Sequence, residues 1–365
     1  MRLLFISSKD VKRKSNGGEL CTNRNYLSFC SLLGEENVKV INLLDNLTPG
    51  AVHALKKRLN YLRGLFWGLS GKVVRDLLHQ AKDYDLVFID SSIHGVLASA
   101  LKKSGYGGRI ISFFHNVEYR IQSQKLRIKP WKLAEVLVVQ YNERMACRHA
   151  DQIIALNSRD SKELERIYGA RNVDIIPISL TDQFEGDPEG EQTTIPPTFI
   201  FTGNNWYANL HGLDWFISNV LNEVDITLQI TGYKMDELRD RYIHPKIDFL
   251  GFVKDLPAAI RAADYVLAPV FIGSGMKVKT CEALMYGKNI VGTTESFEGY
   301  DVDFNRVGAR CDTKEEFIEA IRRLSSEKRD KFNHYSRSRF LDFYSFDATL
   351  KLFRKYTDVS GVVYE

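Results

Sequence analysis

The sequence predicts an α/β protein with two domains, each built on an open parallel sheet. Short apolar runs typical of buried strands alternate with longer amphipathic stretches typical of helices along nearly the whole chain. Such alternation indicates a parallel sheet with helices on both faces. The length of 365 residues suits two domains of roughly 150 to 200 residues each. An acidic, proline-bearing stretch at 185–198 separates the two series and predicts a linker.

The first series of alternating elements predicts an N-terminal domain over residues 1–184. Its expected strands lie at 2–7, 38–42, 85–90, 109–114, 152–156 and 173–177. Its expected helices lie at 20–33, 71–80, 95–103, 133–150 and 158–168. In sheets of this kind, ligands bind at the carboxyl ends of the strands.

The second series restarts after the linker and predicts a domain over residues 199–335. Strands are expected at 199–202, 227–231, 248–250, 265–269 and 289–293. Helices are expected at 210–220, 255–263, 276–286, 314–324 and 328–338. The amphipathic run at 346–356 makes 336–365 a helical C-terminal segment, which we expect to pack back on the first domain.

Composition excludes several classes of protein. Lysine and arginine (50) nearly balance aspartate and glutamate (46), so the net charge of +4 argues against a dedicated nucleic-acid binder. The five cysteines are odd in number and contain no close pair, which favours a reducing, cytoplasmic setting. We find no signal-peptide pattern and no apolar run near the ~18 residues that suggest a membrane span.

The stretch at 271–287 is the strongest candidate for a binding site. Gly273 and Gly275 allow a sharp turn and a close approach of backbone to ligand, and the helix that follows directs its free N–H groups at an anion. Lys279 adds a cation, and Glu282 places a carboxylate one turn deeper on the same helix face. The pattern indicates a site for a diphosphate and a ribose. The alternative is an ordinary strand-loop-helix unit with a solvated ion pair.

Two features of the first domain also carry candidate residues. Gly17 and Gly18 lie between the first strand and the first helix, where a glycine loop can cradle phosphate or sugar; the alternative is a helix-entry turn. His115 directly follows the apolar strand at 109–114, so it is expected at the edge of the sheet where active sites lie. The alternative for His115 is a loop histidine with satisfied hydrogen bonds.

The second half of the chain resembles the nucleotide-sugar-binding domain of GT-B glycosyltransferases, and is most similar to the retaining family-four enzymes. The resemblance covers nearly the whole chain and rests on segments 201–209, 229–232, 249–253, 263–269, 271–287 and 294–299. It implies two Rossmann-like domains facing a central cleft. It also implies a catalytic role for His115 and donor-binding roles for Phe252, Val253, Gly273, Ser274, Gly275, Met276, Lys279 and Glu282. Among these, the base is expected near Phe252 and Val253, the diphosphate at the glycine loop, and the ribose on Glu282. Gly17, Gly18 and Asn204 are donor-binding candidates from their positions before helices.

The sequence departs from the family pattern at two places. Many relatives have a second glutamate eight positions before the ribose-binding one, where this chain has Ser274, so the resemblance does not identify the sugar. Many relatives also open the second domain with arginine and lysine, where this chain has Asn204, Asn205 and Trp206. Lys279 must then neutralise more of the diphosphate charge.

These residues together predict a glycosyltransferase that moves a sugar from a nucleotide diphosphate sugar to a carbohydrate or polyprenyl-diphosphate-linked saccharide, in the synthesis of cell-surface polysaccharide or glycoconjugate. We expect no metal and no cofactor besides the donor. Retention is implied by the resemblance alone, with a front-face route; an inverting mechanism stays open if Glu19, Glu118 or another carboxylate of the first domain is the base. The alternative function is a non-catalytic nucleotide-sugar-binding protein. A GT-B epimerase or phosphorylase fits less well.

Two segments that mix cations with aromatic residues, 55–69 and 125–132, resemble interfacial membrane segments. They predict a peripheral contact with an anionic membrane surface at the inner face of the membrane. The alternative is that their aromatic side chains pack into the domain while the cations remain solvated.

Overall fold

The computed structural model describes residues 1–46, 60–61, 63–124, 126, 129–185, 192–327 and 330–358. The chain divides into two compact units. The first contains Met1–Pro177 and Thr349–Glu365, and the second contains Ile178–Ala348. Part of the predicted linker, residues 186–191, lies outside the described ranges.

The first unit is built on a parallel six-stranded sheet of order β2-β1-β3-β4-β5-β6. Its central strands β1, β3, β4 and β5 are buried at every residue or at all but the first, which is expected of a sheet covered on both faces, whereas the edge strands β2 and β6 are partly exposed. The chain turns back at one place in this order, between the adjacent strands β1 and β3. The strands are β1 (Leu3–Ser7), β2 (Val38–Asn42), β3 (Leu86–Ile89), β4 (Arg109–Phe114), β5 (Gln152–Ala155) and β6 (Val173–Ile175).

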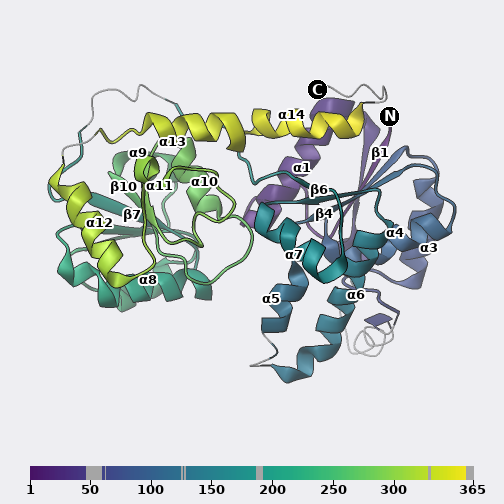
Figure 1. Ribbon diagram of the computed structural model, residues 1–365, viewed down its shortest axis with the longest axis horizontal. Coiled ribbons are helices and arrows are strands. Elements are labelled where there is room, and N and C mark those ends of the chain that lie inside the picture. Colours follow the sequence, from purple (N-terminus) through teal and green to yellow (C-terminus); the bar gives the residue numbers. More distant parts are fainter. Residues whose placement is uncertain are drawn as a thin grey trace. The chain divides into compact units, whose positions relative to one another are not determined.

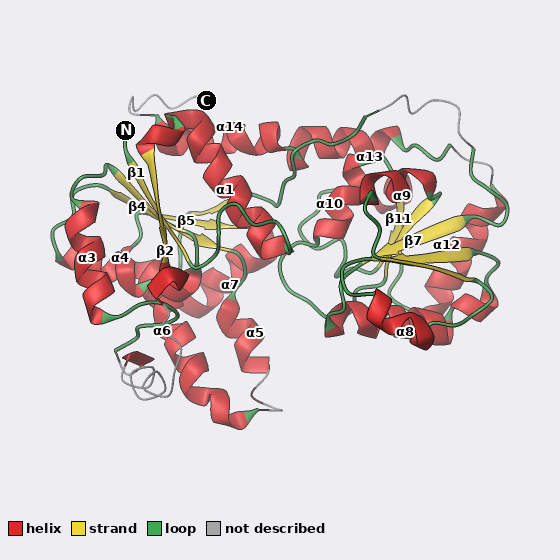
Figure 2. Cartoon of the chain, turned by 180° about the vertical axis from the view of Figure 1, so that it is seen from behind, coloured by secondary structure: helices red, strands yellow, loops and turns green. Residues whose placement is uncertain are grey.

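Helices cover both faces of this sheet (Figure 1). Helix α14 begins in the second unit and ends in the first, where it lies beside α1: the rings of Phe29 and Phe353 are 5.1 Å apart. Helix α5 and the first turns of α6 extend away from the sheet in both views (Figures 1 and 2). The helices are α1 (Gly17–Leu33), α3 (Gly71–Ala81), α4 (Val96–Lys103), α5 (Glu118–Gln124), α6 (Leu133–His149), α7 (Ser158–Tyr168) and α14 (Phe346–Thr357).

The second unit has a parallel six-stranded sheet of order β12-β11-β10-β7-β8-β9, with the reversal between β7 and β10. Helices α8 and α12 meet on one face through Phe216 and Phe317. The strands are β7 (Thr198–Thr202), β8 (Thr227–Thr231), β9 (Ile247–Gly251), β10 (Tyr265–Ala268), β11 (Asn289–Gly292) and β12 (Gly308–Arg310). The helices are α8 (Tyr207–Asn219), α9 (Leu256–Ala262), α10 (Val278–Met285), α11 (Phe304–Val307), α12 (Lys314–Ser326) and α13 (His334–Arg339).

The predicted pair of parallel α/β sheets is confirmed, and most predicted strands agree with the structure within one or two residues. Three helix starts were wrong. Helix α8 begins at Tyr207, three residues before the predicted start at 210. Helix α13 begins at His334 and not at 328, because the side chain of Asn333 caps it by accepting from the N–H of Ser336. Helix α1 already begins at Gly17, three residues before the predicted start. Helix α5 and the short strand β12 were not predicted.

The segment at 63–69 is largely core. Leu65, Phe66 and Leu69 are buried, with Phe66 only 4 % exposed and packed against Val138 of α6. Trp67 is 50 % exposed. The prediction that this segment enters a membrane was therefore wrong for Leu65, Phe66 and Leu69, whose apolar surface is already used within the unit. Residues 55–59, 62, 125, 127 and 128 of the two predicted interfacial segments lie outside the described residues.

Truncation of the neighbouring aromatic residues Phe66 and Trp67 should have different consequences. Phe66→Ala leaves a cavity and should reduce the free energy of unfolding by about 3–5 kcal/mol. Trp67→Ala removes a half-exposed side chain and should change it by less than about 1 kcal/mol. Chemical denaturation of both variants measures this difference, and equal losses would contradict the core position of Phe66.

Candidate functional site

In a sheet with this strand order, ligands are expected at the carboxyl ends of the two strands that flank the reversal, here β7 and β10. Where neighbouring strands of a parallel sheet send their connections in opposite directions, the two loops separate and leave room for a ligand. In the second unit these loops are 203–206, which leads into α8, and 269–277, which leads into α10. Both loops contain residues that the sequence predicted to bind the donor.

The loop before α10 is held in place by the side chain of Lys277. The ammonium of Lys277 lies 2.7 Å from a carboxylate oxygen of Glu295 and donates to the carbonyl oxygen of Gly275 at 2.8 Å. Gly275 has a φ of +60°, which favours glycine at this turn. Helix α10 then begins without a side-chain N-cap. Its first N–H groups are thus available for an anion, as at other phosphate-binding helix starts.

Lys279 is placed by residues from three elements. Its ammonium donates to Oδ1 of Asn209 at 3.1 Å and lies 4.3 Å from the centre of the Phe201 ring. The amide of Asn209 in turn donates to Oδ1 of Asn204 at 2.7 Å. Burial lowers the pKa of Lys279 to about 7, although Glu282 opposes that shift. An anionic ligand would restore the charge of Lys279.

Glu282 lies one turn further along α10 and keeps part of its side chain exposed. Burial raises its pKa to about 7, and Lys279 only partly offsets this. Among the described residues, no hydrogen-bond donor is recorded for its carboxylate. A partly buried carboxylate without a hydrogen-bond donor is stabilised when hydroxyl groups of a ligand donate to it.

The other predicted donor-binding residues of this unit lie at the same edge of the sheet, after β9 or in the glycine loop. Phe252 is exposed, and its N–H donates to Asp236 at 3.1 Å. Met276 is buried, and its sulfur accepts from the N–H of Ile178 at 3.4 Å, so only its backbone can face a ligand. Val253 and Ser274 are half-buried, and Gly273 is exposed.

The first unit gathers polar side chains at its own reversal point, between β1 and β3. Asp90, which directly follows β3, is buried and accepts from Thr22 at 2.6 Å, Asn25 at 2.8 Å and Ser7 at 3.2 Å. Although burial opposes it, the net effect of His115 and these donors is to lower the pKa of Asp90. The carboxylate is therefore ionised at neutral pH.

His115 lies directly after β4 and beside Asp90. Its Nε2 is 3.0 Å from the backbone oxygen of Asp90 and 3.4 Å from Oδ2. Burial and Lys9 lower the pKa of His115, but Asp90 and Cys21 outweigh them and raise it to about 9. Its Nδ1 is buried and has no hydrogen-bond partner among the described residues. Because this nitrogen has no exposed surface, its contact with a ligand stays a prediction.

Gly17 and Gly18 form the first turn of α1, which agrees with the helix-entry alternative rather than a separate loop. Asn16 caps this helix by accepting from the N–H of Glu19 at 3.0 Å. The ammonium of Lys9 lies where a side chain at Gly18 would begin, 2.9 Å from the position of such a Cβ. Gly18 therefore leaves space for Lys9, and any ligand contact of these glycines stays a prediction.

The structure brings Asn204, Lys279 and the glycine loop together, and it adds residues that the sequence analysis did not select. Asn209 connects Asn204 to Lys279, and Lys277 fixes the loop. In the first unit the missed residue is Asp90. The sequence did contain one indication of its role: Asp90 directly follows an apolar strand, as His115 does. The structure shows that these two strands, β3 and β4, are neighbours.

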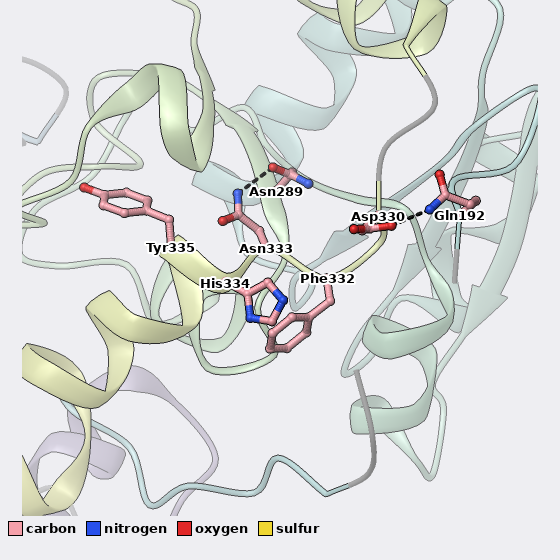
Figure 3. A pocket seen from close by; sticks show the side chains of 7 residues that line it. All are labelled: Gln192, Asn289, Asp330, Phe332, Asn333, His334 and Tyr335. Atoms are coloured by element: carbon pink, nitrogen blue, oxygen red, sulfur yellow. Dashed lines mark hydrogen bonds between the residues drawn. The ribbon is translucent and has the colours of Figure 1, made fainter. Parts of the chain in front are cut away.

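A hollow of about 500 Å³ lies elsewhere on the second unit (Figure 3). It opens beside Asn289, at the amino end of β11, which is the edge of the sheet opposite to the glycine loop. Its side chains bond one another: Gln192 donates to Asp330 and Asn333 donates to Asn289, as the dashed lines in Figure 3 show. It contains none of the predicted residues. Its lining is Gln192, Asn289, Asp330, Phe332, Asn333, His334 and Tyr335.

The described residues contain neither a grouped metal-binding set nor a helix able to span a membrane. Within the ranges that the structure describes, no three His, Cys, Asp or Glu side chains are grouped so as to hold a metal ion. In the same ranges, no helix combines the length and the apolar character needed to cross a bilayer.

Comparison with known families identifies the second unit. Residues 196–327 match the sequence model of the family described as glycosyl transferases group 1. The matched segment runs from just before β7 to the end of α12, so the likeness covers most of the second unit. No curated protein sequence matches the chain.

Solved structures resemble the whole chain at low sequence identity. HepE from Anabaena, solved in complex with UDP-glucose, is 13% identical with a TM-score of 0.64 over 98% of this chain and 99% of that one. The lipopolysaccharide outer core galactosyltransferase WaaB is 15% identical with a TM-score of 0.68 over 98% and 99%. Sucrose-phosphate synthase from Thermosynechococcus elongatus is 13% identical with a TM-score of 0.70 over 99% and 100%. These likenesses show the fold, which is the two-domain GT-B architecture.

Proposed function

We propose that this protein transfers a sugar from a uridine diphosphate sugar to a saccharide acceptor. The observation that carries the proposal is the site at the β7–β10 reversal, where Lys279 and Glu282 follow an uncapped helix start behind a glycine loop. UDP and UDP-glucose are bound by HepE, which has the same fold. The donor diphosphate lies at the start of α10 in this proposal, and its ribose hydroxyl groups donate to Glu282.

Electrostatic stabilisation of the leaving group provides most of the proposed catalysis. The bond between the anomeric carbon and the diphosphate oxygen breaks, and the diphosphate takes the electron pair. Lys279 and the N-terminus of α10 stabilise that charge. The acceptor hydroxyl forms the new bond and gives its proton to the departing diphosphate in a front-face route. His115 hydrogen-bonds near the reacting carbon, the role that the family resemblance gives it.

Retention of configuration and independence of metal are part of the proposal. The two carboxylates considered as inverting bases are engaged locally: Glu19 accepts from the N–H of Ser15 at 2.9 Å, and Glu118 accepts from Asn116 at 3.2 Å. The proposal therefore assigns neither carboxylate the role of base. The cationic charge that a metal would supply comes from Lys279 and the helix N-terminus.

We place the acceptor among carbohydrates or polyprenyl-diphosphate-linked saccharides used for cell-surface polysaccharide or glycoconjugate, handled in the cytoplasm at an anionic membrane. An exposed apolar stripe on the first unit supports the membrane contact. Leu133, Leu137 and Tyr141 follow one another at intervals of four on α6, after Trp131, which is 74 % exposed. We name these four residues the α6 stripe. Cations outnumber acidic groups beside it, with Lys129, Lys132, Arg144 and Arg148 against Glu135.

The proposed transfer is tested by incubating the protein with a panel of nucleotide sugars and measuring release of free nucleotide, with and without saccharide acceptors. We expect one uridine diphosphate sugar to release UDP, faster with a suitable acceptor. Added EDTA should leave the rate unchanged. Loss of turnover on chelation, restored by manganese or magnesium, would contradict metal independence.

A non-catalytic nucleotide-sugar-binding protein is the second candidate, because the site has what nucleotide binding needs without requiring His115. Tight binding of a nucleotide sugar with no turnover across the panel would establish it. The panel therefore separates the two functions.

Lys279→Ala and Glu282→Ala should each weaken UDP binding by about 1–3 kcal/mol, the range for a charge-assisted hydrogen bond. Because the pKa of Lys279 is about 7 without ligand, its ammonium fraction falls as pH rises above 7. Wild-type affinity for UDP should therefore fall from pH 7 to pH 9, approaching a factor of ten per pH unit at the upper end, and Lys279→Ala should lose this dependence. Calorimetry measures both effects.

The control for these variants is Lys314→Ala, which removes an exposed lysine of α12. It should bind UDP as the wild type does at every pH. Wild-type affinity in both site variants would remove the donor from α10.

Replacing two residues of the α6 stripe should reduce attachment to membranes. Wild type should co-sediment with anionic vesicles, less so at high salt, and poorly with neutral vesicles. Trp131→Ser with Leu137→Ser should reduce co-sedimentation even at low salt, because the apolar contribution is not screened. Ile243→Ser, which changes an exposed apolar residue of the second unit, should have no effect. Unchanged co-sedimentation of the double variant would rule out the stripe as the membrane contact.

A further inference from the structure

Helix α6 carries a buried carboxylate that holds two active-site loops together. Glu143 is 0 % exposed and accepts four hydrogen bonds. Its Oε1 accepts from the backbone N–H of Glu118 at 2.7 Å and from the hydroxyl of Ser92 at 3.1 Å. Its Oε2 accepts from the hydroxyl of Tyr168 at 2.8 Å and from the N–H of Tyr119 at 3.3 Å.

Two of these donors belong to the loops that carry Asp90 and His115. Ser92 begins the short helix η3 (Ser92–His94), two residues after Asp90. Glu118 begins α5, three residues after His115. The same oxygen of Glu143 therefore bonds one residue from the β3–α4 loop and one from the β4–α5 loop. Replacing that oxygen removes a hydrogen bond to each of the two loops at once.

The rest of α6 supports the same two loops. Asn142, the residue before Glu143, caps α4 by accepting from the N–H of Val96 at 3.0 Å. Gly95 allows the close approach, since a Cβ there would lie 2.0 Å from the backbone oxygen of Asn142. The centre of α6 thus fixes the starts of α4 and α5, the helices that follow Asp90 and His115.

A buried carboxylate without a cation is an expensive feature for a purely structural cap. Among the described residues no ion-pair partner is recorded for Glu143, and burial raises its pKa to about 7. An asparagine or serine caps a helix at less desolvation cost. A glutamate differs from both in having two carboxylate oxygens, which here accept from donors of three elements at the same time.

We infer that Glu143 is a positioning residue for the Asp90–His115 pair, acting through Ser92 and the N-terminus of α5. Glu143 contacts neither a reacting atom nor His115 itself. It fixes the separation of the two loops, and with it the 3.4 Å approach of the imidazole to the carboxylate of Asp90. The role in catalysis rests on the proposed transfer reaction, whereas the effect on the ion pair does not.

The test is Glu143→Gln, which keeps the shape of the side chain but replaces one acceptor oxygen by a donor amide. The first readout is the titration of His115 by NMR of histidine-labelled protein, with His115→Gln used to assign its signal. We expect the titration midpoint to fall by about one pH unit or more in Glu143→Gln, because the imidazolium loses its close carboxylate. The second readout is turnover of the nucleotide sugar selected from the panel, where kcat should fall at least about tenfold while KM for the donor changes little.

Two control variants separate positioning from general stability. Val139→Ala leaves a cavity on the same helix and should lower the melting temperature without moving the His115 midpoint. Tyr168→Phe removes a donor that belongs to neither loop and should also leave the midpoint unchanged. If Glu143→Gln does not fold, Ser92→Ala breaks only the bond to the Asp90 loop and should lower the midpoint in part.

A folded Glu143→Gln protein whose His115 midpoint equals that of Val139→Ala would overturn the inference, as would an unchanged midpoint in Ser92→Ala where Glu143→Gln does not fold. If the wild type transfers no sugar from any donor, the proposed function fails. The NMR titration still decides whether Glu143 positions the pair.

Discussion

The reversal of strand order in each sheet is the constraint on which the rest of the structure depends. A parallel sheet covered on both faces has no room for polar side chains except at the strand ends, and only at the reversal do the neighbouring loops separate. In the second unit Lys279, Asn209 and Asn204 meet at that point. In the first unit Asp90 and its donors meet at the corresponding point. The candidate groups of both units therefore follow from topology.

Burial sets the chemical character of these groups. Lys279 and Glu282 lie on one helix face, yet burial shifts the pKa of each toward 7, so that neither is firmly charged without a ligand. A bound diphosphate and ribose would provide the interactions that are missing. Asp90 and His115 differ, because each stabilises the charge of the other and the pair is complete within one unit. Under the proposed function, Lys279 and Glu282 become fully charged only when the donor binds, whereas Asp90 and His115 are charged without it.

Helix α6 serves two surfaces with different requirements. Its inner side holds Asn142 and Glu143, which fix the starts of α4 and α5. Its outer side presents the α6 stripe, whose four side chains are between 44 % and 74 % exposed. Because Asn142 and Glu143 hold the backbone of α6 in place, the exposed side chains of this helix are held in fixed positions as well.

The sequence by itself determined the fold class, most strands, and the glycine loop with Lys279 and Glu282, because apolar periodicity and helix spacing are local properties of the chain. It could not decide which side chains meet across elements. Asn209 reaches Lys279 over 70 positions, and Glu143 reaches Ser92 over 51. Nor could it decide that Phe66 is buried while Trp67 is half-exposed. Two adjacent aromatic residues give the same sequence pattern whether they pack in the core or face solvent. Only tertiary packing fixes these contacts, because burial and pairing depend on residues distant in the chain.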